Sequence, residues 1–240
     1  MLVLLLACAP ATSEAQLPAA AATPNLLLLI HGGGDDPSVW ADAMGEAAAG
    51  ALADPSAWTV LAYDWHEAAA SSMSAAPNGE AEGAAMAPRL VGAGFTHVHL
   101  LAHSVGGMVV DGLLGALPAE RDFTVHATFL DPFCFLDLGQ ADYGNRHFGE
   151  GADFAESYLN TDDPAPSTSE PLDHAHTFDV TGVRPDSVDA ADGHRWPITW
   201  YQSTWTDGEL GAALSAERTG AFDPGLAEAW PAGEETTVGE

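Results

Sequence analysis

The chain has 240 residues, 47% of them hydrophobic, which suits one globular domain with a sizeable core. It carries 35 acidic side chains against six arginines and no lysine, a formal net charge of −29 at pH 7. This charge argues against nucleic acid and unaided docking on anionic membranes, because phosphate groups attract basic surfaces. It predicts a self-repelling, soluble surface, although a lysine-poor genome would give the same balance.

The N-terminal residues predict export. An apolar run from Met1 to Ala7 is followed by Cys8, and the four residues ending at Cys8, Leu-Leu-Ala-Cys, are similar to the lipobox of a bacterial lipoprotein signal. Cys8 would then be a lipid anchor, and the protein an extracytoplasmic lipoprotein; cleavage further on, for example after Ala15, would make it secreted. The run lacks the basic residues that precede a secretory signal and is too short to span a bilayer. We assign 1–24 to a signal-like segment and linker.

Strands and helices are expected to alternate through the first half of the chain. The apolar run Leu26–Ile30 ends at the four residues His31–Gly34, and a short run bounded by glycines is typical of a buried strand in a parallel sheet. A helix is expected over 38–52, a second strand over 58–63 and a loop over 66–79.

The same alternation continues through the middle of the chain. A helix over 80–91 is stopped by glycines, and a strand over 96–102 leads into a helix over 105–117; another strand follows at 124–130. Regular alternation predicts an α/β fold with a mostly parallel central sheet and helices on both faces. In such a sheet, ligands bind outside the carboxyl ends of the strands.

The pattern weakens in the second half. Residues 135–175, rich in Asp, Gly, Pro and Ser, are expected to form an excursion over the active site, and 176–180 a last strand. Many acids and few large apolar residues over 219–240 predict a loose acidic tail. The expected domain therefore spans 25–218.

Ser104 lies where a strand is expected to meet a helix. Ala102 and Gly106 flank it, giving A-x-S-x-G where G-x-S-x-G is usual. This context is typical of a nucleophile elbow, in which a tight turn exposes the serine Oγ. A serine hydroxyl becomes nucleophilic only beside a histidine that a carboxylate orients.

A carboxylate and a histidine follow Ser104 in an order that suits a catalytic triad. Asp131 comes directly after a strand and before a proline; Asp179 and Asp186, near the next expected strand, are rival acids. Among the ten histidines, His194 is favoured as the general base because it lies in a polar loop after the last expected strand.

The oxyanion hole is expected from backbone N–H groups. One is that of Val105, directly after the nucleophile, and the second is that of Gly33, with Gly34 as the alternative. His31 is expected to brace this glycine loop. Cys134 lies in an apolar stretch and is expected to be a buried small hydrophobe. The cysteine and histidine spacings predict no metal site.

Together these segments resemble the α/β-hydrolase superfamily, and most of all its pancreatic-lipase-like branch of triglyceride lipases and phospholipases A1. The matching motifs are Ile30-His31-Gly32, Asp64-Trp65, Val98–Gly106, Leu130-Asp131-Pro132, and His194 followed by Trp196, Trp200 and Tyr201. The resemblance implies an α/β-hydrolase fold. The chain departs from the family pattern at Ala102 and in the short stretch between the acid and the base. The resemblance therefore does not imply activity on emulsified triglyceride.

The sequence thus predicts a serine hydrolase of carboxylic esters, an esterase or lipase, with a Ser104–Asp131–His194 triad and an acyl-enzyme intermediate. It requires no cofactor, and its expected partner is a small-molecule ester or lipid substrate. We expect a monomer. Two alternatives keep the same residues: a non-catalytic lipoprotein that binds an acyl ligand or partner, and an amidase.

Overall fold

A single parallel sheet forms the centre of the protein. The computed structural model describes residues 16–208, 210–220 and 222–239, and within these the strands pair in the order β2-β1-β3-β4-β5-β6-β7, every pair parallel. The strands are β1 (Asn25–Ile30), β2 (Trp58–Tyr63), β3 (His97–His103), β4 (Thr124–Leu130), β5 (Phe154–Leu159), β6 (His176–Asp179) and β7 (Glu235–Thr237).

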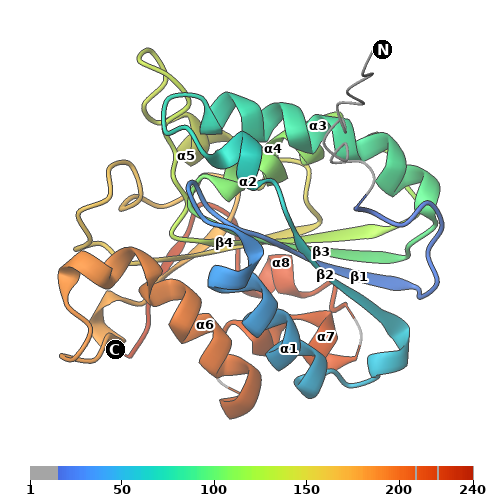
Figure 1. The fold of residues 1–240 in the computed structure, drawn as a ribbon. Coiled ribbons are helices and arrows are strands. Elements are labelled where there is room, and N and C mark those ends of the chain that lie inside the picture. The colour runs from blue at the N-terminus through green and yellow to red at the C-terminus, as the bar shows by residue number, and fades with distance from the viewer. Residues whose placement is uncertain (1–15, 209, 221, 240) are drawn as a thin grey trace, which may run out of the picture.

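Helices cover both faces of the sheet (Figure 1). One face carries α2 (His66–Ala69), α3 (Ala75–Ala93), α4 (Gly106–Ala116) and α5 (Tyr143–His147); the other carries α1 (Ala41–Ala51), α6 (Trp196–Asp207), α7 (Ala216–Thr219) and α8 (Leu226–Ala229). Short 3-10 turns occur at Pro37–Val39, Pro55–Ala57, Thr181–Val183, Ala190–Arg195 and Ala212–Leu214. The predicted α/β fold is confirmed.

The central strands read as continuous apolar runs because both of their faces are buried. In β1, Leu26 and Leu28 pack in the core beneath α3 and α4, whereas Leu27 and Leu29 pack in the core beneath α1 and α6. All four side chains are fully buried. The sheet therefore separates two apolar layers and holds the carboxyl ends of its strands along one edge.

Helices α3 and α4 cross at two glycines. A Cβ placed on Gly83 would lie 1.9 Å from the carbonyl oxygen of Val109, and one on Gly112 would lie 2.0 Å from that of Glu80. Only the missing side chains allow the two backbones to approach this closely. The crossing fixes α4, whose first turn follows Ser104.

The expected excursion over 135–175 is interrupted by a strand that the sequence analysis missed. β5 lies between β4 and β6, and all six of its residues are buried. It was missed because Glu156 and Ser157 break the apolar run, and both are buried in the sheet. The expected loop over 66–79 likewise contains α2 and the first turn of α3.

The prediction of a loose tail over 219–240 is wrong for part of this segment, because β7 pairs with β6 at the edge of the sheet. Trp230 packs against His176 and Phe178, with ring centroids 5.2 Å apart in each pair. Part of the expected N-terminal linker is also ordered: Leu17 is buried, and its carbonyl accepts a hydrogen bond from Arg89. The signal-like run and Cys8 lie outside the described residues.

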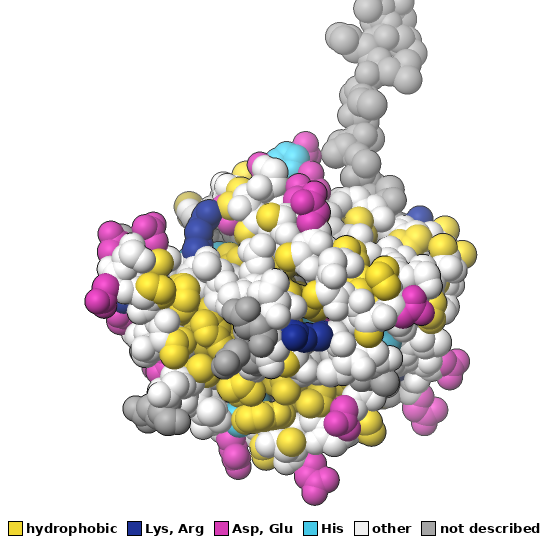
Figure 2. Space-filling view, turned by 90° about the horizontal axis from the view of Figure 1, so that it is seen from below, with side chains coloured by type: hydrophobic (Ala, Val, Ile, Leu, Met, Phe, Trp, Pro, Cys, Tyr) yellow, Lys and Arg dark blue, Asp and Glu magenta, His cyan; other side chains and the backbone are white. Residues whose placement is uncertain are grey.

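Acidic side chains are spread over the surface. On the face that carries α1, α6 and α7, they lie mainly around the periphery, and hydrophobic side chains gather between them (Figure 2). Among the described residues, no helix is both long and apolar enough to cross a membrane.

Candidate active site

The loops that carry the predicted site residues meet at the carboxyl edge of the sheet. The chain runs from β1 outward to β2 and then returns to β3 on the other side of β1. The order of strands therefore reverses between β1 and β3, which is where open α/β sheets form their ligand-binding crevice. The glycine loop follows β1, and Ser104 follows β3.

Ser104 has the geometry of a nucleophile elbow. Its φ of 54° lies in the left-handed region, which is uncommon for a residue with a side chain. Its N–H donates to the Leu130 carbonyl at 3.0 Å, which fixes the turn to β4. Gly106 allows α4 to start close to β1, because a Cβ there would lie 2.7 Å from the His31 carbonyl oxygen.

The structure brings Ser104, His194 and Asp131 into one hydrogen-bonded chain. His194 Nε2 lies 2.9 Å from Ser104 Oγ, and His194 Nδ1 lies 2.6 Å from Asp131 Oδ2. The Ser104 hydroxyl then donates to Nε2, and the Nδ1–H donates to the carboxylate. This is the tautomer that a general base requires.

Asp131 is held rigidly and without exposure to solvent. Its φ is 46°, its N–H donates to the Tyr158 carbonyl at 2.7 Å, and its Oδ1 accepts the Asn160 N–H at 2.9 Å. Burial raises the pKa of Asp131 well above its ordinary value. The rival Asp179 instead accepts the Thr181 N–H at 2.8 Å, as a local turn residue.

Two contacts fix the turn that carries His194. His103 Nε2–H donates to the His194 carbonyl at 3.0 Å, and burial lowers the pKa of His103 so that its ring stays neutral. Arg195 pairs with Asp35, beyond the glycine loop, at 2.7 Å. Burial lowers the pKa of His194 as well, which keeps its Nε2 free to accept a proton.

Gly33 and Val105, whose N–H groups are the two predicted oxyanion donors, are in contact with each other. A Cβ on Gly33 would lie 3.1 Å from Val105 Cγ1, and in the described part of the chain neither N–H donates to a protein acceptor. Gly34 is excluded as the donor, because its N–H is bonded to the Ala69 carbonyl at 3.1 Å. Two free N–H groups beside a serine suit the binding of an oxyanion.

His31 braces the glycine loop, as predicted. Its Nε2 accepts the Trp65 N–H at 3.3 Å, and its carbonyl accepts the Trp65 indole N–H at 2.8 Å. Burial lowers the pKa of His31, so the ring is neutral. The two motifs Ile30-His31-Gly32 and Asp64-Trp65, which lie far apart in the sequence, are thus in direct contact through His31 and Trp65.

A pocket of about 310 Å³ opens beside the serine. Small side chains from α2, the following turn and α3 form one wall, and Phe133 forms another. The lining residues are Gly33, Gly34, Ala69, Ala70, Ser72, Ala75, Ala76, Ser104, Val105 and Phe133. The pocket offers apolar room to a group attached to the carbon that Ser104 would attack.

Asp163 is a residue at this site that the sequence analysis missed. Its side chain is fully buried, and its Oδ2 lies 3.9 Å from His194 Nδ1. Asp163 follows β5, the strand that the sequence analysis had placed inside an excursion. Without that strand, nothing in the sequence brings Asp163 to the carboxyl edge beside Asp131.

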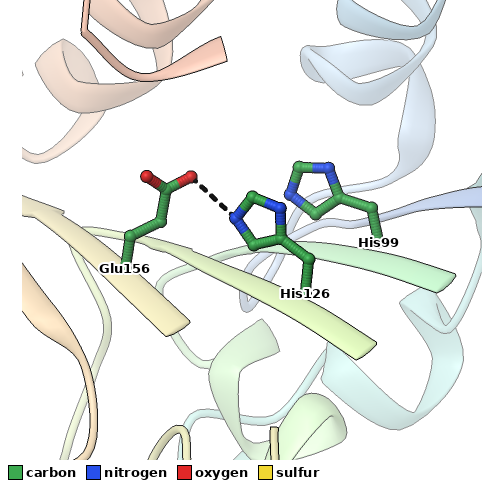
Figure 3. Close-up of side chains that lie close together, drawn as sticks. All are labelled: His99, His126 and Glu156. Carbon is green, nitrogen blue, oxygen red and sulfur yellow. Dashed lines mark hydrogen bonds and ion pairs between the residues drawn. The ribbon is translucent and has the colours of Figure 1, made fainter. Parts of the chain in front are cut away.

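A second group of titratable side chains lies on the face of the sheet that carries α7, away from Ser104. His99, His126 and Glu156 project from adjacent strands β3, β4 and β5 into one buried cluster (Figure 3). Their nitrogen and oxygen atoms come within 4.8 Å of one another, which is close enough for metal ligands. The two rings, however, stack at an interplanar angle of 5° with centroids 4.0 Å apart, so their lone pairs lie in separate parallel planes and cannot converge on one ion.

The cluster fits a hydrogen-bond network better than a metal centre. The Thr128 hydroxyl lies between its members, 2.7 Å from His99 Nε2 and 2.8 Å from Glu156 Oε1. The other nitrogen of His99 lies 2.8 Å from Glu217, which α7 contributes. Although burial raises the pKa of Glu217, the charge and hydrogen bond of His99 outweigh it and lower that pKa to about 2.

Glu217 should therefore make stability depend on pH. A carboxyl whose folded pKa is depressed stabilises the fold above its unfolded pKa, and that contribution is lost as pH falls from about 4.5 toward 2. We expect Glu217→Gln to cost about 3 kcal/mol at pH 6.5 and much less at pH 3. Urea unfolding at both pH values measures this, with Glu46→Gln on the exposed surface of α1 as control; a cost that does not change with pH would contradict it.

No protein-family model matches the sequence, and no curated protein matches it either. Among solved structures, the chain is similar to a lipase-esterase related protein from Clostridium acetobutylicum ATCC 824, with 18% sequence identity and a TM-score of 0.33. The similarity covers 49% of this chain and 47% of that one, so it spans about half the length of the relative.

Proposed function

We propose that this protein is a serine hydrolase that cleaves carboxylic esters through an acyl-enzyme. The observation that carries the proposal is the continuous hydrogen-bonded chain from Ser104 Oγ through His194 to the buried carboxylate of Asp131, at 2.9 and 2.6 Å. Nucleophile, base and orienting acid come from three separate loops, and such an arrangement is what activates a serine hydroxyl.

In the first half of the reaction, Ser104 Oγ attacks the ester carbonyl carbon while His194 Nε2 takes the hydroxyl proton. The carbonyl oxygen becomes an oxyanion, which the N–H groups of Gly33 and Val105 stabilise. When the intermediate collapses, the bond to the leaving alcohol breaks and His194 returns the proton to that alcohol. Asp131 holds the ring and stabilises the imidazolium that forms in between.

In the second half, water replaces the alcohol. His194 takes a proton from the water, whose oxygen attacks the acyl-enzyme carbonyl, and the same two N–H groups stabilise the second oxyanion. When the bond to Ser104 Oγ breaks, His194 returns that proton to Oγ, which releases the carboxylic acid and restores the serine hydroxyl. An N–H group that stabilises the oxyanion in this way contributes about 10²–10³-fold to the rate.

The pocket beside Ser104 favours catalysis over passive binding. It is open next to the nucleophile and lined mainly by alanines and glycines together with Phe133, so it can hold the acyl group of an ester whose carbonyl reaches Ser104. A non-catalytic acyl-binding protein has no need of two unpaired N–H groups at the serine.

The direct test is labelling of the wild-type protein with a fluorophosphonate probe, together with hydrolysis of p-nitrophenyl esters from acetate to palmitate. We expect labelling at Ser104 and turnover of short and medium chains. The same triad chemistry can cleave an ester or an amide bond, so the hydrolysis of anilides with matching acyl groups distinguishes an esterase from an amidase. Folded protein that neither labels nor turns over would reject the proposal.

The size of the pocket should set the preferred chain length. Ala70 lines the pocket at its exposed rim, so Ala70→Trp would place a large ring where the end of an acyl chain lies. We expect kcat/KM for octanoate to fall roughly 10-fold or more, with acetate changed much less, because a bound chain loses about 0.8 kcal/mol per methylene left in water. Ala49→Trp, on the exposed surface of α1, is the control; an equal loss for both esters would contradict the assignment.

We also propose export, with Cys8 as a lipid anchor. The support is the sequence of the first eight residues alone, Met-Leu-Val-Leu-Leu-Leu-Ala-Cys. Mass spectrometry of the mature N-terminus tests it. A free, uncleaved Met1 in protein from its native host would reject both export and lipidation.

A further inference from the structure

Two buried carboxylates, rather than one, face the histidine at this site. Asp131 comes from the end of β4 and Asp163 from the loop after the neighbouring strand β5. Both side chains are fully buried, and their oxygens lie with His194 Nδ1 in a group whose atoms are all within 4.8 Å of one another. The mechanism described above uses only Asp131.

The surroundings of Asp163 hold it in place but do not neutralise it. Its Oδ1 accepts the Ala165 N–H at 2.5 Å, and its Oδ2 accepts the hydroxyl of the buried Thr168 at 3.2 Å. In the described part of the chain, its one ion-pair partner within 4 Å is His194. The nearby Arg184 is already paired with the exposed Asp162, at 2.5 and 2.7 Å.

Two carboxylates buried this close cannot both ionise without a large cost, so they tend to share one proton. Asp131 already accepts two N–H groups, from Asn160 and His194, and these favour its charged form. Asp163 likewise accepts the Ala165 N–H and the Thr168 hydroxyl, so the shared proton belongs to the pair rather than to either carboxyl alone. Burial first, and then the hydrogen bond and charge of Asp163, raise the pKa of Asp131, in keeping with a shared proton.

We propose that Asp163 is a positioning residue that forms with Asp131 a carboxyl–carboxylate pair, which shares one proton and presents a single negative charge to His194. This inference rests on the proposed function for its kinetic consequence, but not for its geometry. The turn that carries His194 packs directly on the pair: a Cβ on Gly193 would lie 3.1 Å from Asp163 Cβ.

Among the other titratable groups around the pair, Arg184 is attracted by Asp163 but is hydrogen-bonded to Asp162. His103 and Cys134 are buried, and burial lowers the pKa of the first and raises that of the second, so both are neutral. Arg195 is paired with Asp35. Glu170 adds further negative charge near Cys134. His194 is thus the group that responds to the charge of the pair.

The pair makes a specific prediction for His194. If the pair carries one charge, replacing either aspartate with asparagine leaves that charge in place. Asp163→Asn leaves Asp131 ionised, and Asp131→Asn leaves Asp163, whose Oδ2 lies 3.9 Å from His194 Nδ1. We expect the pKa of His194 in each single variant to stay within about 0.5 unit of wild type, and to fall by about 1–3 units in the double variant.

Activity should follow the same pattern. Replacing the orienting acid of a serine triad by asparagine ordinarily costs about 10⁴-fold in kcat. Because Asp163 can take over the Nδ1–H, we expect Asp131→Asn to lose only about 10²-fold and Asp163→Asn less than 10-fold, whereas the double variant loses about 10⁴-fold. The losses are thus strongly non-additive.

The experiment is a ¹H–¹⁵N NMR titration of the His194 ring in the full chain, paired with pH profiles of kcat/KM for p-nitrophenyl butyrate. Asp162→Asn, one residue away but paired with Arg184 at the surface, is the matched control. A lower pKa of His194 in the Asp163→Asn variant would mean that both carboxyls are ionised in the wild type. An Asp131→Asn variant whose activity is as low as that of the double variant would mean that Asp163 does not reach His194. Either result overturns the pair.

One further measurement, together with the His194 titration itself, keeps the test decisive. Should a variant fail to fold, ¹³C NMR of the aspartate carboxyl carbons in the wild type replaces it: one carboxyl of the pair should titrate above the ordinary range, and two ordinary titrations overturn the proposal. If the wild type proves inactive, the serine-hydrolase function fails. The His194 titration still decides whether the pair exists.

Discussion

Replacing Ser104 with alanine should abolish ester hydrolysis, with kcat falling by about 10⁴-fold or more. The side chain that would form the covalent bond is then missing, and His194 has no hydroxyl to deprotonate. The backbone N–H groups of Gly33 and Val105 stay in place, so a small rate above that of water should remain. Single-turnover and steady-state kinetics with p-nitrophenyl butyrate measure the loss.

Ser72→Ala is the matched control, because Ser72 lines the same pocket without a place in the hydrogen-bonded chain. We expect it to keep activity within a few-fold of wild type. His194→Gln should fall nearly as far as Ser104→Ala, since residues of a triad act as a unit and their effects are not additive. An Ser104→Ala enzyme that retains more than about one hundredth of the wild-type rate would show that another group is the nucleophile.

The three residues expected to act together could be found from the sequence because each follows a recognisable strand or loop. Ser104 lies between an apolar run and a helix, Asp131 follows the next apolar run, and His194 comes after the last strand expected from the sequence. The carboxyl ends of parallel strands share an edge, so sequence order alone implied their proximity. Their distances depend on loops whose path no periodicity predicts.

Asp163 and β5 could not be found in the same way, for one physical reason. β5 buries Glu156 and Ser157, so the apolar pattern that marks a central strand is absent. On the neighbouring strand β4, His126 Nε2 and the Thr128 hydroxyl lie 3.1 and 2.8 Å from Glu156 Oε1, and these tertiary contacts make the burial of its carboxylate possible. A strand stabilised by partners distant in the sequence has no local signature.

The close crossing of α3 and α4 gives the largest expected effect on stability. Gly83→Ala would place a methyl group 1.9 Å from the Val109 carbonyl oxygen and 2.6 Å from the Leu113 nitrogen, both of which are backbone atoms of a buried helix. Neither can rotate away, so the two helices must move apart along much of their contact. We expect a loss of about 3 kcal/mol or more in the free energy of unfolding, measured by urea denaturation.

Gly92→Ala makes the same chemical change in the same helix and separates sterics from helix propensity. Gly92 is exposed near the end of α3, and a Cβ there meets no atom within 4 Å. Alanine should therefore stabilise the protein, by up to about 1 kcal/mol, because it lowers the backbone entropy of the unfolded chain. Opposite signs for the two variants are the expected result. If Gly83→Ala were also stabilising, α3 and α4 could not cross at Gly83 and Gly112, and the position of α4 behind Ser104 would have to be different.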